Sequence, residues 1–417
     1  MKLGCIADDF TGATDLANNL VRSGMRVIQS TGVPTAPLQE DVDAVVVALK
    51  SRTSPAPDAV EVSLQALQWL QANGAQQIYF KYCSTFDSTP QGNIGPVTEA
   101  LLAALDSRFT IATPAFPDNK RTVFKGHLFV GDVLLNESGM QDHPLTPMTD
   151  ANLVRVLQSQ SRGKVGLIDH AVVARGEQAI RERMHALQAG GVTIAIVDAV
   201  SNDDLLRLGP ALRGMPLVTA GSGVAIGLPP NFGIEPSSRA SVLPPAAGLQ
   251  AIVSGSCSLA TNEQVREFIR TGGKALGIDP MRIIVPAAAA AQALAWAEPL
   301  LAAGPVLVYS TADPTAVKQA QGRIGSGTGA MVEQTLAAIA HGLVKLGVRQ
   351  LVVAGGETSG ACVQALGVSQ MRIGPQIDPG VPWCHALLPA GQGLHLALKS
   401  GNFGGADFFR KAFRVLP

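Results

Sequence analysis

The stretch 351–360, Leu-Val-Val-Ala-Gly-Gly-Glu-Thr-Ser-Gly, most constrains the fold, because an apolar strand pattern stops at two glycines and leads into a helix pattern. A buried strand, a glycine turn and a helix start are typical of α/β proteins. The glycines let backbone N–H groups approach an anion, and the helix N-terminus favours negative charge. Thr358 and Ser359 are candidates to cap the helix expected over 361–366 or to bind phosphate. The alternative interpretation is a plain corner without a ligand.

The same alternation of strands, glycine turns and helices recurs along all 417 residues, which is too long for one typical core. The segment 229–248 is rich in proline and serine and has no helix or strand period. We therefore predict an α/β protein of two domains, 1–228 and 249–417, joined by this linker. Each domain is expected to hold a mostly parallel sheet flanked by helices, with the active site in the cleft between the domains.

Strands are expected at 3–7, 25–29, 44–49, 77–83, 110–115, 165–169, 192–197, 217–220, 250–254, 283–285, 306–309 and 350–356, and again from residue 394. A hairpin is expected over 121–130 with its turn at Gly126. The segment 375–383 is predicted to be irregular.

The composition excludes several classes of protein. Lys plus Arg and Asp plus Glu number 32 each, so no overall field attracts nucleic acid or an acidic membrane. The five cysteines form no C-x-x-C pair, which argues against a disulfide framework or a zinc site. Because the chain shows no signal-peptide pattern and no membrane-spanning run, we expect a cytoplasmic protein that binds no membrane.

Two aspartates follow the first predicted strand. Asp8 and Asp9 lie at its carboxyl end, where ligands bind in open parallel sheets, and Thr11 and Gly12 come directly behind. Paired carboxylates could hold sugar hydroxyls, a magnesium ion or a proton in transfer. The alternative is that one aspartate merely caps the following helix.

Lys81 and Asp87 are candidates for the carboxylate and a hydroxyl of one small substrate. Lys81 lies on the strand expected at 77–83, and Asp87 lies in the polar loop that follows. The alternative for Lys81 is that its side chain extends to the surface.

Three loops in the second half are suited to oxyanions. They lie around Ser258, around Glu357 and over 401–405. Thr261 or Asn262 is expected to cap the helix after the first loop, where Cys257 is a weaker candidate nucleophile. Three such loops in one domain favour a nucleotide with its polyphosphate. No G-x-x-x-x-G-K-[ST] motif is present, and the glycine-rich segment 322–329 lacks the dinucleotide fingerprint.

Taken together, these residues resemble the four-carbon acid sugar kinase family. The resemblance rests on six stretches in the family's order that together span nearly the whole chain: Ala7–Ala13, Lys81 with 87–89, 121–126, 255–258, 355–360 and 398–405. Three further stretches, 48–53, 128–131 and 143–148, look most like the branch that acts on 3-oxo-tetronates.

The resemblance implies ATP-dependent phosphorylation of the terminal hydroxyl of a sugar acid, with Mg²⁺ as cofactor. It implies a sugar-acid-binding N-terminal domain and a nucleotide-binding C-terminal domain. The expected ATP contacts are Ser258, Gly355, Gly356, Glu357, Thr358, Ser359, Gly401 and Gly404. Asp8 and Asp9 are the catalytic candidates, and Thr11, Gly12, Lys81 and Asp87 are the substrate-binding ones. The general base, the metal ligands and a homodimer as partner are left open.

Three alternatives remain at this point. The chain could be a D-threonate or D-erythronate kinase that acts on the unoxidised acid. A dinucleotide-dependent oxidoreductase also uses glycine turns, although no strand here is followed by G-x-G-x-x-G. A sugar-acid sensor without catalytic activity is the third.

Overall fold

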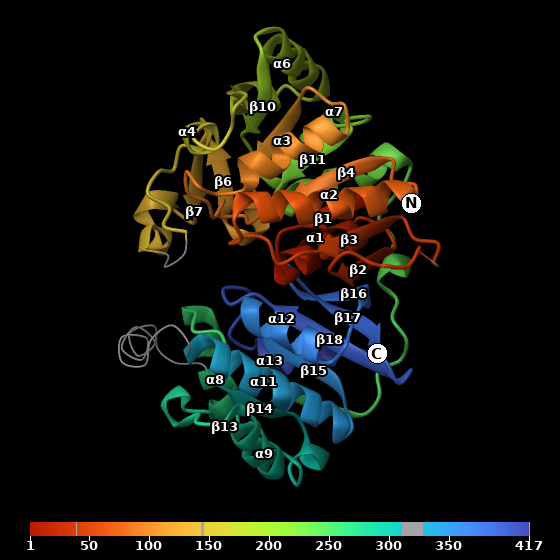
Figure 1. Ribbon diagram of the computed structural model, residues 1–417, viewed down its shortest axis with the longest axis vertical. Coiled ribbons are helices and arrows are strands. Elements are labelled where there is room, and N and C mark those ends of the chain that lie inside the picture. The colour runs from red at the N-terminus through yellow and green to blue at the C-terminus, as the bar shows by residue number, and fades with distance from the viewer. Residues whose placement is uncertain (39, 143–145, 311–327, 417) are drawn as a thin grey trace. The chain divides into compact units, whose positions relative to one another are not determined.

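The computed structural model describes residues 1–38, 40–142, 146–310 and 328–416, and the chain divides into two compact units, 1–240 and 241–417 (Figure 1). Each unit has its own sheet flanked by helices, as the sequence predicted. The exact domain and linker bounds stay a prediction. Segment 229–248 contains two short 3₁₀ turns, Pro229–Phe232 and Ser238–Ser241.

The sheet of unit 1 is parallel throughout, in the order β2-β3-β1-β4-β11-β5-β10-β9. Both faces are covered, so the strands read as nearly continuous apolar runs. The strands are β2 (Val27–Thr31), β3 (Ala44–Ala48), β1 (Leu3–Ala7), β4 (Gln77–Lys81), β11 (Leu217–Ala220), β5 (Thr110–Thr113), β10 (Val192–Val197) and β9 (Lys164–Ile168).

The helices of unit 1 are α1 (Phe10–Arg22), α2 (Ala56–Ala72), α3 (Ile94–Ala104), α4 (Leu153–Gln158), α5 (His170–Val173), α6 (Glu177–Ala189) and α7 (Asn202–Ala211). A separate antiparallel sheet contains β6 (Arg121–Phe124), β7 (His127–Val130) and β8 (Val133–Leu134). Its first hairpin confirms the predicted turn. Lys125 and Gly126 both adopt positive φ, 51° and 73°, as a tight two-residue hairpin turn requires.

Unit 2 has the strand order β13-β14-β12-β15-β18-β17-β16. The first five strands run parallel, and β17 and β16 are antiparallel to their neighbours. The strands are β13 (Lys274–Gly277), β14 (Val306–Tyr309), β12 (Leu249–Ser254), β15 (Val348–Ala354), β18 (Gly393–Lys399), β17 (Val381–Leu387) and β16 (Gln370–Asp378).

Helices α8 (Leu259–Arg270), α9 (Pro286–Ala297), α11 (Thr328–Lys345), α12 (Gly356–Ala365) and α13 (Phe408–Val415) cover this sheet. One core cluster in unit 2 joins strands and helices through Ile252, Phe268, Val352, Trp383 and Phe408. Across the described ranges, no helix combines the length and the apolar character that a membrane span needs.

Two strand predictions in unit 2 were wrong. The segment 375–383, expected to be irregular, belongs to β16 and β17. Its prolines are accommodated because the pairing shifts register around Gln376. The strand expected at 283–285 is instead an irregular connection before α9, in which Ile283 is buried and Ile284 is 88% exposed. The sequence also missed β13. Residues 143–145 of the stretch 143–148, and 322–327 of the glycine-rich segment, lie outside the described residues.

Candidate functional sites in the two units

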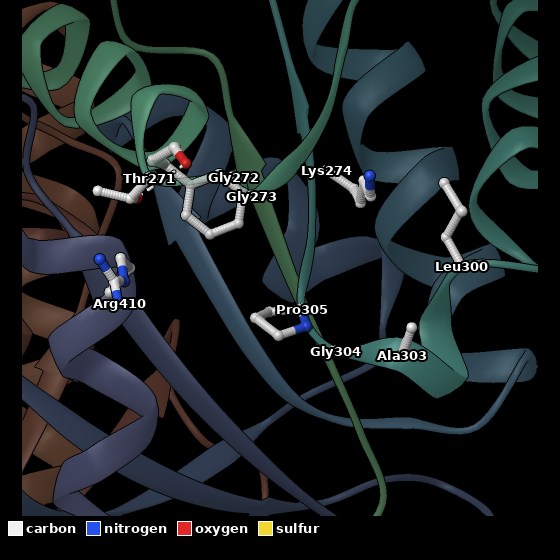
Figure 2. A pocket seen from close by; sticks show the side chains of 10 residues that line it. Thr271, Gly272, Gly273, Lys274, Leu300, Ala303, Gly304, Pro305 and Arg410 are labelled. Carbon is white, nitrogen blue, oxygen red and sulfur yellow. Dashed lines mark hydrogen bonds between the residues drawn. The ribbon is translucent and has the colours of Figure 1, made fainter.

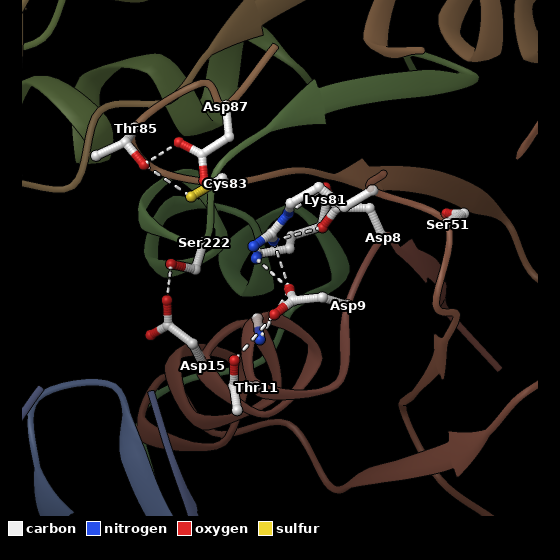
Figure 3. A network of polar contacts seen from close by, with 12 residues as sticks. Asp8, Asp9, Thr11, Asp15, Ser51, Lys81, Cys83, Thr85, Asp87 and Ser222 are labelled. Carbon is white, nitrogen blue, oxygen red and sulfur yellow. Dashed lines mark hydrogen bonds and ion pairs between the residues drawn. The ribbon is translucent and has the colours of Figure 1, made fainter. Parts of the chain in front are cut away.

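Four neighbouring strands of unit 1 end at the same level. Ala7 at the end of β1 pairs with Ala48 of β3 and with Lys81 of β4, and Lys81 pairs with Ala220 of β11. Polar residues that follow these strands therefore meet at one edge of the sheet. This edge holds the predicted residues Asp8, Asp9, Thr11, Gly12 and Lys81 (Figure 3).

Asp8 and Asp9 share one arginine that the sequence analysis did not select. Arg52 donates from Nε and Nη2 to the two oxygens of Asp8 at 2.9 and 2.8 Å, and from Nη2 to Asp9 at 2.5 Å. The Arg52 loop is itself fixed, because the Asn93 amide donates to the carbonyl oxygens of Ser51 and Arg52 at 2.7 and 3.1 Å. The two carboxylates are therefore held in a rigid charged network.

The pKa values of the two carboxyl groups shift in opposite directions. Burial would raise the pKa of Asp9, but Arg52, Lys81 and the bonds from Thr11 and Gly12 lower it to about 2. Burial raises the pKa of Asp8 although Arg52 opposes it. Asp9 also caps α1 by accepting from the Gly12 N–H at 3.1 Å, so the capping role considered for one aspartate is present.

Lys81 is buried rather than extended to the surface, with 3% exposure. Its Nζ lies 3.5 Å from the Oδ1 of Asp9. It can pack onto the first turn of α1 because residue 12 is glycine. A Cβ at that position would lie 1.8 Å from the lysine Nζ. Glycine at position 12 therefore leaves the space that the ammonium group of Lys81 occupies.

Asp15 is a second residue that the sequence analysis missed. It lies on α1 with 4% exposure, and the Ser222 hydroxyl donates to its Oδ2. Within the described residues, its Oδ1 has no hydrogen-bond partner. Burial raises the pKa of Asp15 to about 7, although Lys81 and Ser222 oppose the shift.

Asp87 lies apart from the Asp9–Lys81 pair. It accepts from the Thr85 hydroxyl at 2.6 Å, and Thr85 also contacts the Cys83 sulfur at 2.9 Å. Figure 3 draws these three residues as a group distinct from Asp9 and Lys81. Lys81 and Asp87 thus have separate hydrogen-bond partners, and the binding of one small substrate by both residues stays a prediction.

Arg121 begins β6 and faces this acidic region. Burial lowers its pKa, while Cys83, Asp15 and Asp87 act in the opposite direction. Its Nη1 donates to the Asn119 carbonyl oxygen, and its buried Nε has no partner among the described residues. Nor does the described part of the chain supply a carboxylate in ion-pair contact with it. Arg121 is thus a cation with unused donor capacity.

In unit 2, the three predicted oxyanion loops follow adjacent parallel strands. Ser254 of β12 is in register with Ala354 of β15, and Ala354 with Lys399 of β18. The contacts between the loops are direct. The Ser258 hydroxyl donates to the Gly401 carbonyl oxygen, and the Gly355 N–H donates to the Lys399 carbonyl oxygen at 2.8 Å. The structure therefore brings the three loops together.

The first loop corrects a capping prediction. Ser258, not Thr261 or Asn262, is the N-cap of α8, and it accepts from the Thr261 N–H at 3.2 Å. Gly401 packs against this loop, where a Cβ would lie 2.5 Å from the Ser256 Oγ. A side chain at position 401 would therefore require the Ser256 hydroxyl to move.

The third loop is anchored from inside the protein. Lys399 is fully buried, and its Nζ donates to the Thr261 hydroxyl and to the carbonyl oxygens of Ser400, Gly401 and Phe403 at 2.9 to 3.2 Å. The Gln264 amide also donates to the Phe403 carbonyl oxygen and to two more, those of Gly404 and Gly405. Because the C=O of a trans peptide and the N–H of the next residue point in opposite directions, these bonds turn the N–H groups of Gly401 and Gly404 away from Lys399. The N–H groups of Phe403 and Gly405 donate instead to the Ser400 carbonyl oxygen and to Asp378.

The second loop begins its helix earlier than expected. Helix α12 starts at Gly356, and Gly355 occupies the N-cap position with φ of 121° and no side-chain cap. Thr358 and Ser359 therefore lie in the first turn instead of capping a helix over 361–366. Thr358 packs against the backbone of Gly255, and the buried Ser359 hydroxyl has no partner among the described residues. Glu357 is exposed at the helix start.

Two further features bear on ligands. In the described ranges, no group of three or more His, Cys, Asp and Glu could hold a metal ion.

A pocket of about 260 Å³ in unit 2 lies between the start of β13 at Lys274, Pro305 before β14, and Arg410 of α13 (Figure 2). It is at the amino ends of the strands, so it is separate from the three loops.

Comparison with known proteins gives the same division of the chain. The sugar-binding N-terminal domain family matches residues 3–228, and the nucleotide-binding C-terminal domain family matches residues 251–409. The chain is 58% identical to proteins named 3-oxo-tetronate kinase from Cupriavidus necator and Burkholderia multivorans, over 99% of this chain and 97% of each relative.

Solved structures agree on the fold. A Haemophilus influenzae protein is 45% identical with a TM-score of 0.80, covering 99% of both chains. A Salmonella typhimurium LT2 protein, provisionally described as a tRNA synthase, is 43% identical with a TM-score of 0.89 over 100% of both chains. The fold and sites thus define a protein with one sugar-binding and one nucleotide-binding domain.

Within that class, the chain belongs to the four-carbon acid sugar kinase family, so the family predicted from the sequence is confirmed.

Proposed function

We propose that this protein is an ATP-dependent kinase that phosphorylates the 4-hydroxyl of 3-oxo-tetronate. The products are 3-oxo-tetronate 4-phosphate and ADP. The observation that carries the proposal is the 58% identity to 3-oxo-tetronate kinases over 99% of the chain. The five cysteines are unpaired, which suits a reaction in the reducing cytoplasm, where we place it.

The ATP phosphates are proposed to bind at the three joined loops of unit 2. The backbone N–H groups of Gly401 and Gly404 are oriented away from Lys399, and the first turn of α12 adds its own N–H groups and dipole. Ser258, Gly355, Gly356, Glu357, Thr358 and Ser359 complete the proposed nucleotide set. The two buried hydroxyls of this set, Thr358 and Ser359, can donate to a phosphate oxygen.

Mg²⁺ is proposed to bind mainly through the ATP phosphates. It keeps several waters and takes one or two protein carboxylates, which fits a site with the exposed carboxylate of Glu357 beside it. When bound, Mg²⁺ neutralises charge on the transferred phosphate.

The sugar acid is proposed to bind at the strand ends of unit 1. The ammonium of Lys81 and the guanidinium of Arg121 provide positive charge for its carboxylate. Asp8 and Asp9, fixed by Arg52, keep Lys81 oriented. Thr11 and Gly12 beside them, and Asp87 in the loop after β4, are candidate contacts to the sugar. Phosphoryl transfer depends mainly on such positioning and on charge stabilisation.

A coupled assay of ADP release tests the proposal. Purified protein with Mg-ATP is offered 3-oxo-tetronate, D-threonate and D-erythronate in parallel. We expect kcat/KM for 3-oxo-tetronate to exceed the other two at least tenfold. Preference for D-threonate or D-erythronate would reassign the substrate, and no ADP release with any of the three would refute the proposed function. Stabilisation by NADH and not by ATP would instead favour an oxidoreductase.

A further inference from the structure

We propose that Asp15 is the catalytic base that accepts the proton of the substrate 4-hydroxyl. This inference rests on the proposed kinase function and names a residue outside the pair Asp8 and Asp9. The γ-phosphorus forms a bond to the 4-oxygen as its bond to the β,γ-bridging oxygen breaks. ADP leaves, and the hydroxyl proton moves to Oδ1 of Asp15.

The hydrogen bonds of Asp8 and Asp9 disfavour these two residues as bases. Asp9 accepts from Arg52, Thr11 and Gly12 and lies beside Lys81, so its lone pairs are engaged. The two oxygens of Asp8 accept one donor each from the guanidinium of Arg52. Against the effect of burial, these bonds and the neighbouring cations lower the pKa of Asp9 to about 2, so Asp9 binds a proton poorly. Burial raises the pKa of Asp8, but the guanidinium of Arg52 occupies both of its oxygens, so neither is open to the substrate hydroxyl.

Asp15 differs from Asp8 and Asp9 because only one of its two carboxyl oxygens accepts a hydrogen bond within the described residues. Ser222 donates to Oδ2 and fixes the carboxyl group, while Oδ1 is buried without a partner in the described structure. A buried polar atom without a partner is costly, so its retention here needs an explanation. A hydroxyl that donates its proton to Oδ1 would satisfy the atom.

The charges around Asp15 suit a base that works near neutral pH. Lys81 on β4 and Arg121 on β6 favour its ionised form, and Asp9 on α1 disfavours it. The buried Tyr79 hydroxyl on β4 also faces it and stays protonated, because burial raises the pKa of Tyr79. Burial outweighs the cations and leaves the pKa of Asp15 at about 7. A pKa close to the working pH is optimal for proton transfer.

The variant D15N tests the inference, with D43N as the matched control, because Asp43 is ion-paired to the exposed Arg26 outside the cluster. We expect kcat of D15N to fall at least about 100-fold, as loss of a general base does, with the KM for ATP nearly unchanged. Wild-type kcat should rise with pH through about 7, because the base must be ionised, and the residual D15N rate should lack this rise.

A second variant covers the case in which D15N does not fold. S222A removes the donor to Oδ2, so the pKa of Asp15 should rise, and the increase in kcat should move to higher pH. An unmoved pH profile in S222A, or a D15N kcat within about threefold of wild type, would overturn the assignment. Wild-type protein without tetronate kinase activity would refute the proposed function itself, which keeps the two failures distinct.

Discussion

Gly12 determines whether Lys81 can occupy the proposed sugar-acid site. We predict that Gly12→Ala displaces the lysine, because the new Cβ would lie 1.8 Å from its Nζ and 2.2 Å from the Oδ1 of Asp9. The KM for the sugar acid should rise at least about tenfold, a loss of about 1.4 kcal/mol, while the KM for ATP stays within about twofold. Gly139→Ala is the control, since a Cβ at that position would have nothing within 4 Å. An unchanged sugar-acid KM would contradict the steric argument.

Arg121 is predicted to bind the substrate carboxylate. Arg121→Met should raise the KM for the sugar acid about tenfold or more and affect kcat less, because a charge contact made equally in the ground and transition states is lost. Steady-state kinetics at saturating ATP measure the effect. Arg155→Met is the comparison, since Arg155 already pairs with Asp150 at the surface. Equal KM values in the two variants would exclude Arg121 from the substrate site.

The sequence predicted which strand-end residues of unit 1 converge but not all of their partners. Asp8, Asp9 and Lys81 follow apolar runs, and parallel strands end at one edge of a sheet. Arg52 is also a polar residue that follows an apolar strand, β3. Only the spatial order β3-β1-β4, which the sequence does not reveal, places Arg52 against Asp8. Asp15 was missed for another reason. Helix α1 is buried on nearly all sides, so its polar residues do not form a solvent-facing stripe. The hydrophobic pattern therefore does not show that Asp15 is buried.

At the scale of elements, the loop after β18 depends on one buried lysine. Lys399→Met should leave the carbonyl oxygens of Ser400, Gly401 and Phe403 with fewer donors, at a cost of about 1–3 kcal/mol. We expect a lower Tm and a weaker affinity for ATP, measured by calorimetry, with the sugar-acid KM unchanged. Lys345→Met, at the end of α11 and away from this loop, should change neither quantity. ATP affinity equal to wild type in the Lys399 variant would contradict the role of this loop.

In unit 2, the sequence predicted strands that are plain apolar runs but not strands with other patterns. Strands β12, β14 and β15 are apolar runs that end at glycine or serine, so the hydrophobic pattern alone was sufficient to predict them. Strands β16 and β17 contain prolines that normally argue against a strand, and only the shifted register around Gln376 accommodates them. Ser258 and Thr261 are both good capping residues, and the hydroxyls of both donate to the Gly401 carbonyl oxygen, so the residue types do not show at which of them α8 begins.

At the scale of the whole molecule, the two-unit organisation has a thermodynamic consequence. Each unit has its own sheet and buried residues, so the chain need not unfold in a single step. Tryptophans report on both units. Trp69 lies on α2 of unit 1, whereas Trp296 and Trp383 lie in unit 2, where the buried Trp383 Nε1 donates to the Ala412 carbonyl oxygen at 2.8 Å.

We therefore predict that a non-hydrolysable ATP analogue stabilises unit 2 selectively. At about 100 times its Kd, a ligand that binds only the folded state adds about 2.7 kcal/mol. Urea unfolding is followed by fluorescence in two variants, one keeping only Trp69 (W296F with W383F) and one keeping only Trp383 (W69F with W296F). With Mg²⁺ and the analogue, the Trp383 midpoint should rise and the Trp69 midpoint should move much less. Equal shifts would show that the units unfold as one cooperative block, and a shift confined to Trp69 would contradict the assignment of the nucleotide to unit 2.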